Sequence, residues 1–174
     1  MSRLGIDFYR QDVLVVAPAL IGKLLVRQFP DGKIMRYRIT ETEAYRGEED
    51  MACHARVGKT KRTYPLYKRG GYAYVYLCYG IHYLFNVVTG LKDYPQAVLI
   101  RGVEGYHGPA KLTNMMHINQ SLNMADLTTS NAIWLEDDGF KAQYTTANRV
   151  GIDYASEPYK SIKWRYIMKR EATF

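Results

Sequence analysis

An aromatic segment, residues 72–86, constrains the fold of this 174-residue chain more than any other part of the sequence. Its first tyrosines recur with the two-residue period of a β-strand, which places their rings on one face: Tyr72, Tyr74 and Tyr76. Tyr79-Gly80 interrupts the run, and residues 81–88 read as a second strand. The segment therefore predicts two strands joined by a tyrosine-tipped turn. Such an aromatic face either packs against a core or stacks on flat ligands, of which nucleic-acid bases are the commonest.

Strands also dominate the prediction for the rest of the chain. They are expected at residues 25–29, 33–44, 96–103, 133–136 and 164–168. The first two flank Pro30-Asp31-Gly32, which is a turn-forming trio. Residues 47–71 form a long polar and basic connection, and a connection of this length inside a compact domain is usually functional or disordered.

Two helices are expected between these strands. The first is capped by Asp12 or a neighbouring polar residue, continues through residues 19–24 and carries Pro18 in its first turn. The second begins at residues 108–112 and extends to about Ile118. Strands predominate, helices are segregated, and no repeat or linker divides the sequence. We therefore predict a single α+β domain that covers residues 1–174.

The charge of the chain favours a polyanionic partner. Its net charge is +7, whereas its hydrophobic content of 47% and charged content of 24% are those of an ordinary globular protein. No apolar run approaches the roughly 20 residues that span a bilayer, and the N-terminus lacks a signal-peptide pattern. Two cysteines make no disulfide framework. We expect an intracellular protein that does not associate with a membrane.

The cysteines and histidines do not predict a metal centre. Cys53-His54 and Cys78 with His82 could be drawn as zinc ligands. However, adjacent residues of a strand point to opposite faces, and no Cys-x-x-Cys pair exists. Free cysteines are more often small buried hydrophobic residues, so we expect no metal ligands here.

Two carboxylates at the end of the second predicted strand are candidates for chemistry. Unless a bulge intervenes, Glu41 and Glu43 share one strand face with Tyr37, Ile39 and Tyr45, and the apolar start of that face predicts that it points inward. Burying carboxylates is costly unless they are paired, hydrogen-bonded or used. A structural glutamate paired with an arginine is one interpretation, with Arg36 or Arg101 as the partner. The other is a base that activates water or stabilises an oxocarbenium-like centre.

Several motifs together identify a family. They occur in order along the chain as Glu41-Thr42-Glu43-Ala44-Tyr45, Glu49-Asp50, His54, Tyr74-Val75-Tyr76, Tyr79-Gly80, Asn86, Arg101, Gly108-Pro109-Ala110-Lys111-Leu112 and Arg149-Val150-Gly151. In this order and spacing they resemble the alkyladenine, or 3-methyladenine, DNA glycosylase family. The resemblance extends from about Leu4 to Tyr166. One motif alone would be weak, but the ordered set is highly specific.

The resemblance implies a fold and an activity. The fold is a curved, mainly antiparallel β-sheet with flanking helices and a protruding β-hairpin that inserts into DNA. The activity is that of a monofunctional DNA N-glycosylase of base excision repair, which flips a damaged purine out of double-stranded DNA and hydrolyses its N-glycosidic bond. The implied purines are 3-methyladenine, hypoxanthine, ethenoadenine and 7-methylguanine. The implied enzyme is a monomer that needs no cofactor and no obligate protein partner, in the cytoplasm of a bacterium or the nucleus or another DNA-containing compartment of a eukaryote.

The resemblance also assigns catalytic roles. Glu43 is implied as the general base, and Arg101 and the backbone carbonyl of Val150 hold the attacking water. Neutral bases would also need an acid, which the sequence does not identify. A lyase step would need an amine with a depressed pKa. The lysines of the basic connection are better interpreted as phosphate contacts, so we expect no lyase activity: Lys59, Lys61 and Lys68.

Four residues are implied to bind the extruded base. Tyr45 and Tyr76 stack on it. His54 contacts it from the other side, and the backbone N–H of His54 donates to the purine six-position. Asn86 crowds the two-amino group of guanine and so disfavours normal guanine.

DNA contacts are implied around the predicted hairpin. Tyr79 is the wedge that fills the gap left by the flipped nucleotide. The other implied DNA-binding residues are His82, Tyr83, Lys59, Arg62 and Lys111. The chain departs from the family pattern in residues 58–63, where Lys61 and Thr63 replace proline and asparagine, in the short connection 102–107, and at His82, where an apolar residue is usual.

Two other functions fit the same residues. A non-catalytic binder of damaged or single-stranded nucleic acid would use the same aromatic residues and positive charge. A hydrolase of RNA or of nucleosides is a weaker alternative. The first differs from a glycosylase in the role of Glu43, and the second in the substrate on which the enzyme acts.

Overall fold

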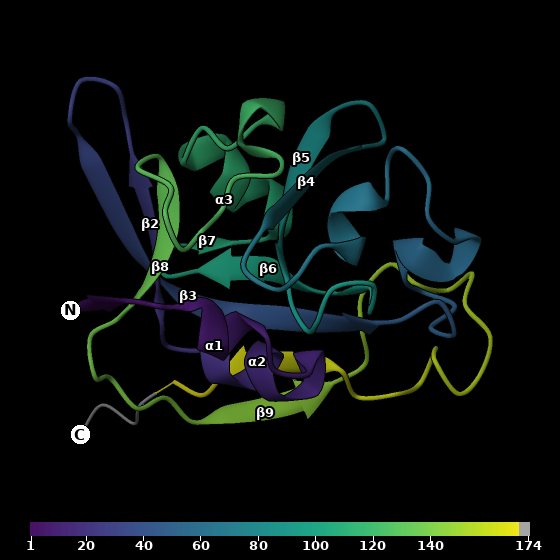
Figure 1. The fold of residues 1–174 in the computed structure, drawn as a ribbon. Helices are drawn as coiled ribbons and strands as arrows, with labels where there is room; N and C mark the ends of the chain where they lie inside the picture. Colours follow the sequence, from purple (N-terminus) through teal and green to yellow (C-terminus); the bar gives the residue numbers. More distant parts are fainter. Residues whose placement is uncertain (171–174) are drawn as a thin grey trace.

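A long central strand organises the fold. The computed structural model describes residues 1–170, and in it β3 (Ile34–Arg46) pairs with β2 (Leu24–Gln28) along its first half and with β6 (Gln96–Val103) along its second half. Within the described residues the sheet has the strand order β1-β8-β2-β3-β6-β5-β4, and its neighbouring strands are antiparallel (Figure 1). β10 (Arg165–Met168) pairs with the second half of β3 along the edge opposite to β6. The second half of β3 therefore lies between two partners.

The remaining strands are shorter: β1 (Ser2–Arg3), β4 (Ala73–Cys78), β5 (His82–Val88), β7 (Tyr106–His107), β8 (Ile133–Asp137) and β9 (Tyr144–Ala147). The helices are α1 (Ile6–Tyr9), α2 (Val13–Leu20) and α3 (Pro109–Met115), with short 3₁₀ helices η1 (His54–Val57), η2 (Tyr64–Tyr67) and η3 (Gln120–Leu122). The α+β class with a mainly antiparallel sheet is confirmed. No helix in the described part of the chain is long and apolar enough to cross a membrane.

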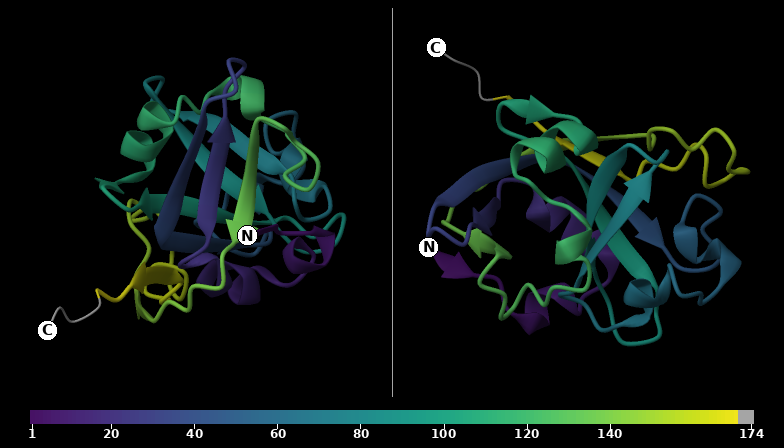
Figure 2. Two further views of the ribbon diagram at one scale, coloured as in Figure 1. Left: turned by 90° about the vertical axis from the view of Figure 1, so that its left-hand side faces the viewer. Right: turned by 90° about the horizontal axis from the view of Figure 1, so that it is seen from above.

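The main core lies between one face of the curved sheet and the helices. Val16 and Leu20 of α2 and Leu112 of α3 are fully buried there against Ile39 of β3 and Val98 of β6. Figure 2 shows the sheet curling around this core. Burying such side chains contributes roughly 1.5–3 kcal/mol each before the entropic cost of folding. The core thus fixes the sheet whose other face carries the site.

The first helix was predicted correctly at its start and incorrectly at its end. The Asp12 side chain accepts a hydrogen bond from the backbone N–H of Leu14, as an N-cap does. The helix ends at Leu20 because Gly22 adopts a φ of +88°, and β2 begins at Leu24. Pro18 therefore lies beyond the first turn, in which it was expected.

Residues 47–71 cross the second face of the sheet, at the right of Figure 1. They are not structureless, because they contain η1 and η2. Cys53 and Leu66 from this connection pack on Tyr74 of β4 and Ala97 of β6, forming a smaller hydrophobic cluster. The connection therefore covers one end of the sheet face that is opposite the main core.

An irregularity in β3 overturns the prediction that five alternating residues share one face. The pairing of β3 with β6 shifts register on both sides of Glu41. Before the shift, Ile39 faces the main core. After the shift, Ala44 faces it instead, and Thr42 points the same way, because its hydroxyl donates to the Ala17 carbonyl of α2. Tyr37 also packs on the main core. Glu41, Glu43 and Tyr45 therefore do not share the face of Tyr37 and Ile39, and lie on the opposite face.

Other strands were predicted to within about two residues, but some elements were missed. β1, β7, β9 and α1 are short and carry no clear periodicity. The predicted end of α3 at Ile118 is also too late, since the helix ends at Met115. Backbone pairing to a neighbour, rather than local pattern, defines such short strands.

Candidate active site

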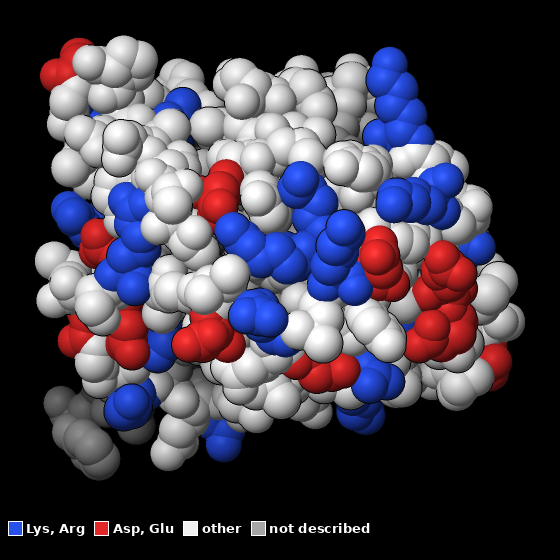
Figure 3. Space-filling model, in the orientation of Figure 1, with Lys and Arg blue, Asp and Glu red and all other residues white. Residues whose placement is uncertain are grey.

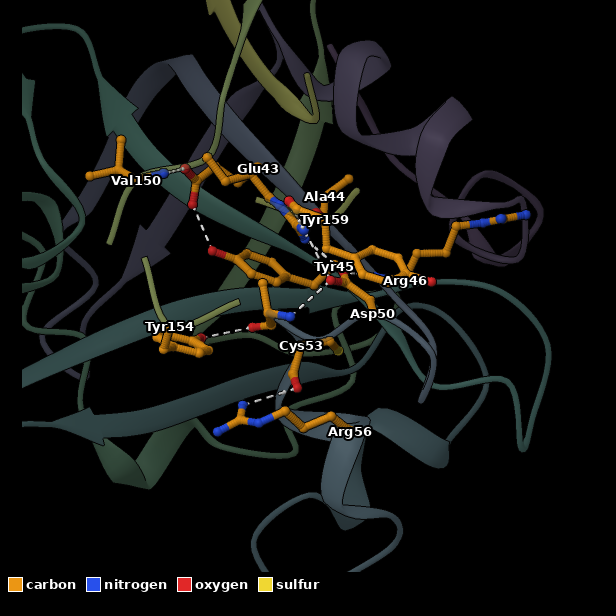
Figure 4. Close-up of polar contacts among 12 residues, drawn as sticks. Glu43, Ala44, Tyr45, Arg46, Asp50, Cys53, Arg56, Val150, Tyr154 and Tyr159 are labelled. Atoms are coloured by element: carbon orange, nitrogen blue, oxygen red, sulfur yellow. Dashed lines mark hydrogen bonds and ion pairs between the residues drawn. The ribbon is translucent and has the colours of Figure 1, made fainter. Parts of the chain in front are cut away.

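Glu43 is a fully buried carboxylate with a separate donor for each oxygen. The Tyr45 hydroxyl donates to Oε1 at 2.8 Å, and the backbone N–H of Val150 donates to Oε2 at 2.6 Å (Figure 4). Arg101 Nη1 lies 3.9 Å from Oε1. Burial raises the pKa of Glu43 and outweighs the lowering by Arg101, Val150 and Tyr45. The carboxylate is thus held in one orientation and is more basic than an exposed glutamate.

A cavity of about 420 Å³ opens beside this carboxylate. Strands β3 to β6 supply one wall and the segments 52–54 and 150–154 supply the other. The residues predicted to form the pocket line it together: Tyr45, His54, Tyr76, Asn86, Arg101 and Val150. The volume is in the range of small-molecule sites. Residues that are more than one hundred positions apart in sequence therefore meet at one cavity.

Val150 contacts the site through a different backbone group from the one predicted. Its backbone carbonyl was expected to hold a water molecule, whereas the contact seen in the structure is its N–H to Glu43. Val150 is 44% exposed. The N–H and carbonyl of one residue point in different directions, so this contact is separate from the water-holding role that was predicted.

His54 lies against the aromatic wall. Its ring centroid is 4.4 Å from that of Tyr76, with the planes tilted by 57°, and its Nδ1 is 2.9 Å from the Tyr74 hydroxyl. Burial and the charges of Arg62 and Arg56 lower the pKa of His54 to about 4. The imidazole is therefore neutral at pH 7.

Asn86 is placed by the pairing of β4 and β5. It lies opposite Tyr74 in that pairing, and its Nδ2 donates to the Tyr74 carbonyl at 3.2 Å. Only 4% of Asn86 is exposed. Its amide is thus oriented by the backbone of the strand that also carries Tyr76.

The β4–β5 hairpin ends in the predicted tyrosine-tipped turn. Tyr79 and Gly80 both have positive φ, at 51° and 67°, as the central residues of a type I′ turn do. Tyr79 is 91% exposed and yet lines the mouth of the cavity. His82 is exposed, whereas Tyr83 packs partly on the main core. The turn geometry therefore presents Tyr79 to solvent at the edge of the site.

The predicted DNA-binding arginine and lysines lie at different distances from the cavity. The Arg62 guanidinium lies 5.4 Å from the Tyr76 ring and lines the cavity. Lys59 lies 3.9 Å from Asp93 and over the rings of Tyr64 and Tyr67, and Lys111 is exposed on α3. Figure 3 shows Lys and Arg at the upper right, where Figure 1 places the hairpin tip and the residue 47–71 connection. Arg62 is the member of this set nearest the cavity walls.

A buried ion pair behind Tyr45 was in the recognised motifs, but no role was assigned to it. The Asp50 carboxylate accepts from both terminal nitrogens of Arg149, at 2.6 and 2.9 Å, and neither side chain is exposed. Asp50 also accepts the backbone N–H groups of Arg46 and Ala52. The guanidinium lies 4.9 Å from the Tyr45 ring. The pair thus ties the segment before Val150 to the end of β3.

Tyr154 at the cavity mouth was missed by sequence reasoning. Its hydroxyl donates to the Ala52 carbonyl at 3.1 Å (Figure 4), and the Arg56 guanidinium lies 5.1 Å from its ring. It belongs to a segment without regular secondary structure, where no period marks it. Across residues 1–170 no group of three or more His, Cys, Asp and Glu side chains is placed to hold a metal ion.

Comparison with known proteins gives one consistent family. The model of the family described as Methylpurine-DNA glycosylase (MPG) matches residues 7–107 and 104–172. A protein of Natranaerobius thermophilus is 42% identical over 191 residues, covering 96% of each chain. One of Desulfitobacterium hafniense is 41% identical, covering 97% of this chain and 96% of its own, and one of Borrelia garinii is 42% identical, covering 93% and 94%. All three carry 3-methyladenine DNA glycosylase in their names. With the family model matching nearly the whole chain and relatives above 40% identity, this protein belongs to the methylpurine-DNA glycosylase family, whose members hydrolyse N-glycosyl bonds.

Proposed function

We propose that this protein excises alkylated and deaminated purines from duplex DNA, with Glu43 as the general base. The proposed purines are 3-methyladenine, hypoxanthine, ethenoadenine and 7-methylguanine. The observation that carries the proposal is the buried Glu43 carboxylate, held by Tyr45 and Val150, which both line the cavity, whereas Glu43 itself lies behind them. A target purine must leave the base stack to reach such a site.

The proposed reaction is a hydrolysis without a covalent enzyme intermediate. Water attacks the sugar carbon C1′ and gives a proton to Glu43, while the C1′–N bond breaks and its electron pair leaves with the base. A cationic alkylated base leaves as a neutral molecule, so it needs no acid. A neutral base such as hypoxanthine must gain a proton as it leaves. We assign Arg101, whose Nη1 lies 3.9 Å from Glu43 Oε1, to help hold the water.

The neutral state of His54 suits a cationic base. An imidazolium at this position would repel a positively charged purine, and the lowered pKa of His54 avoids that repulsion. A purine in face contact with both rings requires about 7 Å between them, since each contact takes about 3.5 Å. The rings of His54 and Tyr76 are 4.4 Å apart at their centroids. We therefore expect Tyr76 to turn away from His54 when a purine enters between them.

The substrate class is tested with a set of duplexes that each contain one lesion. Released bases are separated by chromatography after incubation with the wild-type protein, and the abasic product is checked for strand cleavage. Release of free purine without cleavage supports the monofunctional glycosylase. Tight binding with no released base would support the non-catalytic binder, and faster release from free nucleosides than from duplex would support the nucleoside hydrolase.

Replacing Tyr79 with alanine is expected to weaken lesion binding. Tyr79 is exposed at the hairpin tip, so this change should not disturb the fold. Loss of one base–aromatic stack costs roughly 1–3 kcal/mol, which lowers the affinity for a lesion duplex by roughly 5- to 150-fold. Fluorescence anisotropy measures the affinity. Tyr94→Ala is the matched control because Tyr94 is 65% exposed and does not line the cavity. Equal affinity of the Tyr79 variant and the control would exclude a wedge role.

Replacing Asn86 with alanine is expected to relax discrimination against guanine. Removing the amide opens space beside the two-amino group, and a contact of this size sets about a tenfold or greater preference. Single-turnover excision of hypoxanthine and of guanine from otherwise identical duplexes gives the ratio. A hypoxanthine-to-guanine ratio equal to that of the wild type would contradict this role for Asn86.

A further inference from the structure

The second carboxylate of the strand, Glu41, has no part in the reaction proposed above. The irregular pairing of β3 at Glu41 places it on the same face as Glu43 and Arg101. Such irregularities re-aim side chains and are over-represented beside active sites. A carboxylate that is only 18% exposed on this face needs partners or a use. The contacts of Glu41 show which of these applies.

Glu41 contacts two arginines through one oxygen. Arg165 Nη1 donates to Oε1 at 2.9 Å, and Arg101 Nε lies 3.4 Å from the same atom. The other end of Arg101 faces Glu43, with Nη1 at 3.9 Å. Four side chains of alternating charge therefore follow one another: Glu43, Arg101, Glu41 and Arg165.

The far end of this row holds the segment that contacts Glu43. Arg165 Nε donates to the Asn148 carbonyl at 2.7 Å, two residues before Val150. Val150 N–H in turn donates to Glu43. Glu41 is thus linked to two of the groups that fix Glu43, namely Arg101 directly and Val150 by way of Arg165.

We infer that Glu41 and Arg165 are positioning residues, which divide the charge of Arg101 between two carboxylates and hold the Asn148–Val150 segment against Glu43. This inference rests on the proposed role of Glu43 as the base. Without Glu41, Arg101 is free to pair fully with Glu43. Without Arg165, the unpaired Glu41 draws Arg101 away from Glu43. The two losses therefore change the charge felt by Glu43 in opposite directions.

The test compares Glu41→Gln with Arg165→Gln by single-turnover excision from pH 4 to pH 9. Each variant should slow the reaction by roughly 10- to 100-fold, since small misplacements of catalytic groups have effects of this size. The affinity for lesion duplex should stay within about twofold, because neither residue lines the cavity. The acid limb of the rate profile should move to lower pH in Glu41→Gln and to higher pH in Arg165→Gln.

A matched ion pair between β3 and the residue that follows β8 provides the control. Asp138 pairs with Arg38 at 2.8 Å, and their exposed fractions of 22% and 18% resemble those of Glu41 and Arg165. Asp138→Asn should leave both rate and acid limb unchanged. Unmoved acid limbs, shifts in the same direction, or an equal loss of rate in Asp138→Asn would overturn the inference.

The proposed base and the positioning role fail in different ways. If Glu43→Gln retained excision, the proposed base would be wrong. If Glu43→Gln were inactive and Glu41→Gln fully active, only the positioning role would be refuted.

Discussion

Glu43→Gln is expected to reduce single-turnover excision of every lesion by about 10²- to 10⁴-fold, the usual contribution of a general base. The amide cannot accept the proton of the attacking water. It can keep a hydrogen bond to each neighbour. Its oxygen accepts from Val150 N–H as the carboxylate does, and its nitrogen donates to the Tyr45 hydroxyl oxygen, which reverses the direction of that hydrogen bond. Release of free base is measured alongside affinity for the same duplex. Affinity should stay near the wild-type value.

The raised pKa of Glu43 gives two related expectations. Since burial lifts the pKa above the ordinary value of 4.5, wild-type excision should fall on the acid side at a higher pH than for an exposed glutamate. The folded state binds the proton more tightly than the unfolded state does. The contribution of Glu43 to stability is therefore greatest below pH 4.5 and declines as pH rises through the folded value. Glu43→Gln should consequently be no less stable than the wild type at pH 7.

The outcome that contradicts the base role is an active and well-folded Glu43→Gln protein. Lost excision together with lost affinity would instead mean that Glu43 holds the DNA or the base. Lost excision with retained affinity separates the glycosylase from a non-catalytic binder. Circular dichroism and thermal unfolding of the variant provide the structural control.

Breaking the buried Asp50–Arg149 pair is expected to have the largest effect on stability. Neither side chain is exposed, and removing one member leaves an uncompensated charge inside the protein. Asp50→Asn should lower the free energy of unfolding by about 3–5 kcal/mol. For a domain of this size that loss corresponds to a fall in Tm of roughly 6–20 °C. Chemical and thermal unfolding measure it.

A double replacement separates the pair from its surroundings. Asp50→Asn with Arg149→Met should be more stable than the sum of the single effects predicts, because both charges are then absent. The exposed pair formed by Lys59 and Asp93 is the control, with side chains exposed by 50% and 61%. Asp93→Asn should change stability by less than about 1 kcal/mol. Similar losses in the buried and exposed pairs would refute the anchoring role of the buried one.

Local pattern predicted the elements that have strong periodicity or turn chemistry. The aromatic alternation and Tyr79-Gly80 predicted the β4–β5 hairpin, whose turn has positive φ at both residues. Asp12 predicted the start of α2 through its side-chain acceptor. The motif set also identified residues that line one cavity, including Tyr45 and Asn86. These successes rest on chemistry that acts within a few residues of the chain.

Other features depend on partners that are distant in sequence. Which face of β3 carries Glu43 was predicted wrongly, because the irregular pairing at Glu41 is set against β6, about sixty residues away. The sequence of a strand does not show which residues of a distant strand will pair with it, or in which register. Tyr154 likewise becomes part of the site only because its segment folds back onto Ala52. Pairing geometry, not local preference, decides such positions.

The sequence by itself determined the strand-rich α+β class, the tyrosine-tipped hairpin and, through its ordered motifs, the glycosylase family. Side-chain period, turn preferences and residue identity are properties of short segments, so the linear chain displays them. Only the tertiary structure decided that Glu43 turns away from the main core, that Val150 N–H meets it, and that Arg149 lies behind Tyr45. These relations arise when strands pair and loops close over the sheet. They follow from the burial of the whole core, which no single segment specifies.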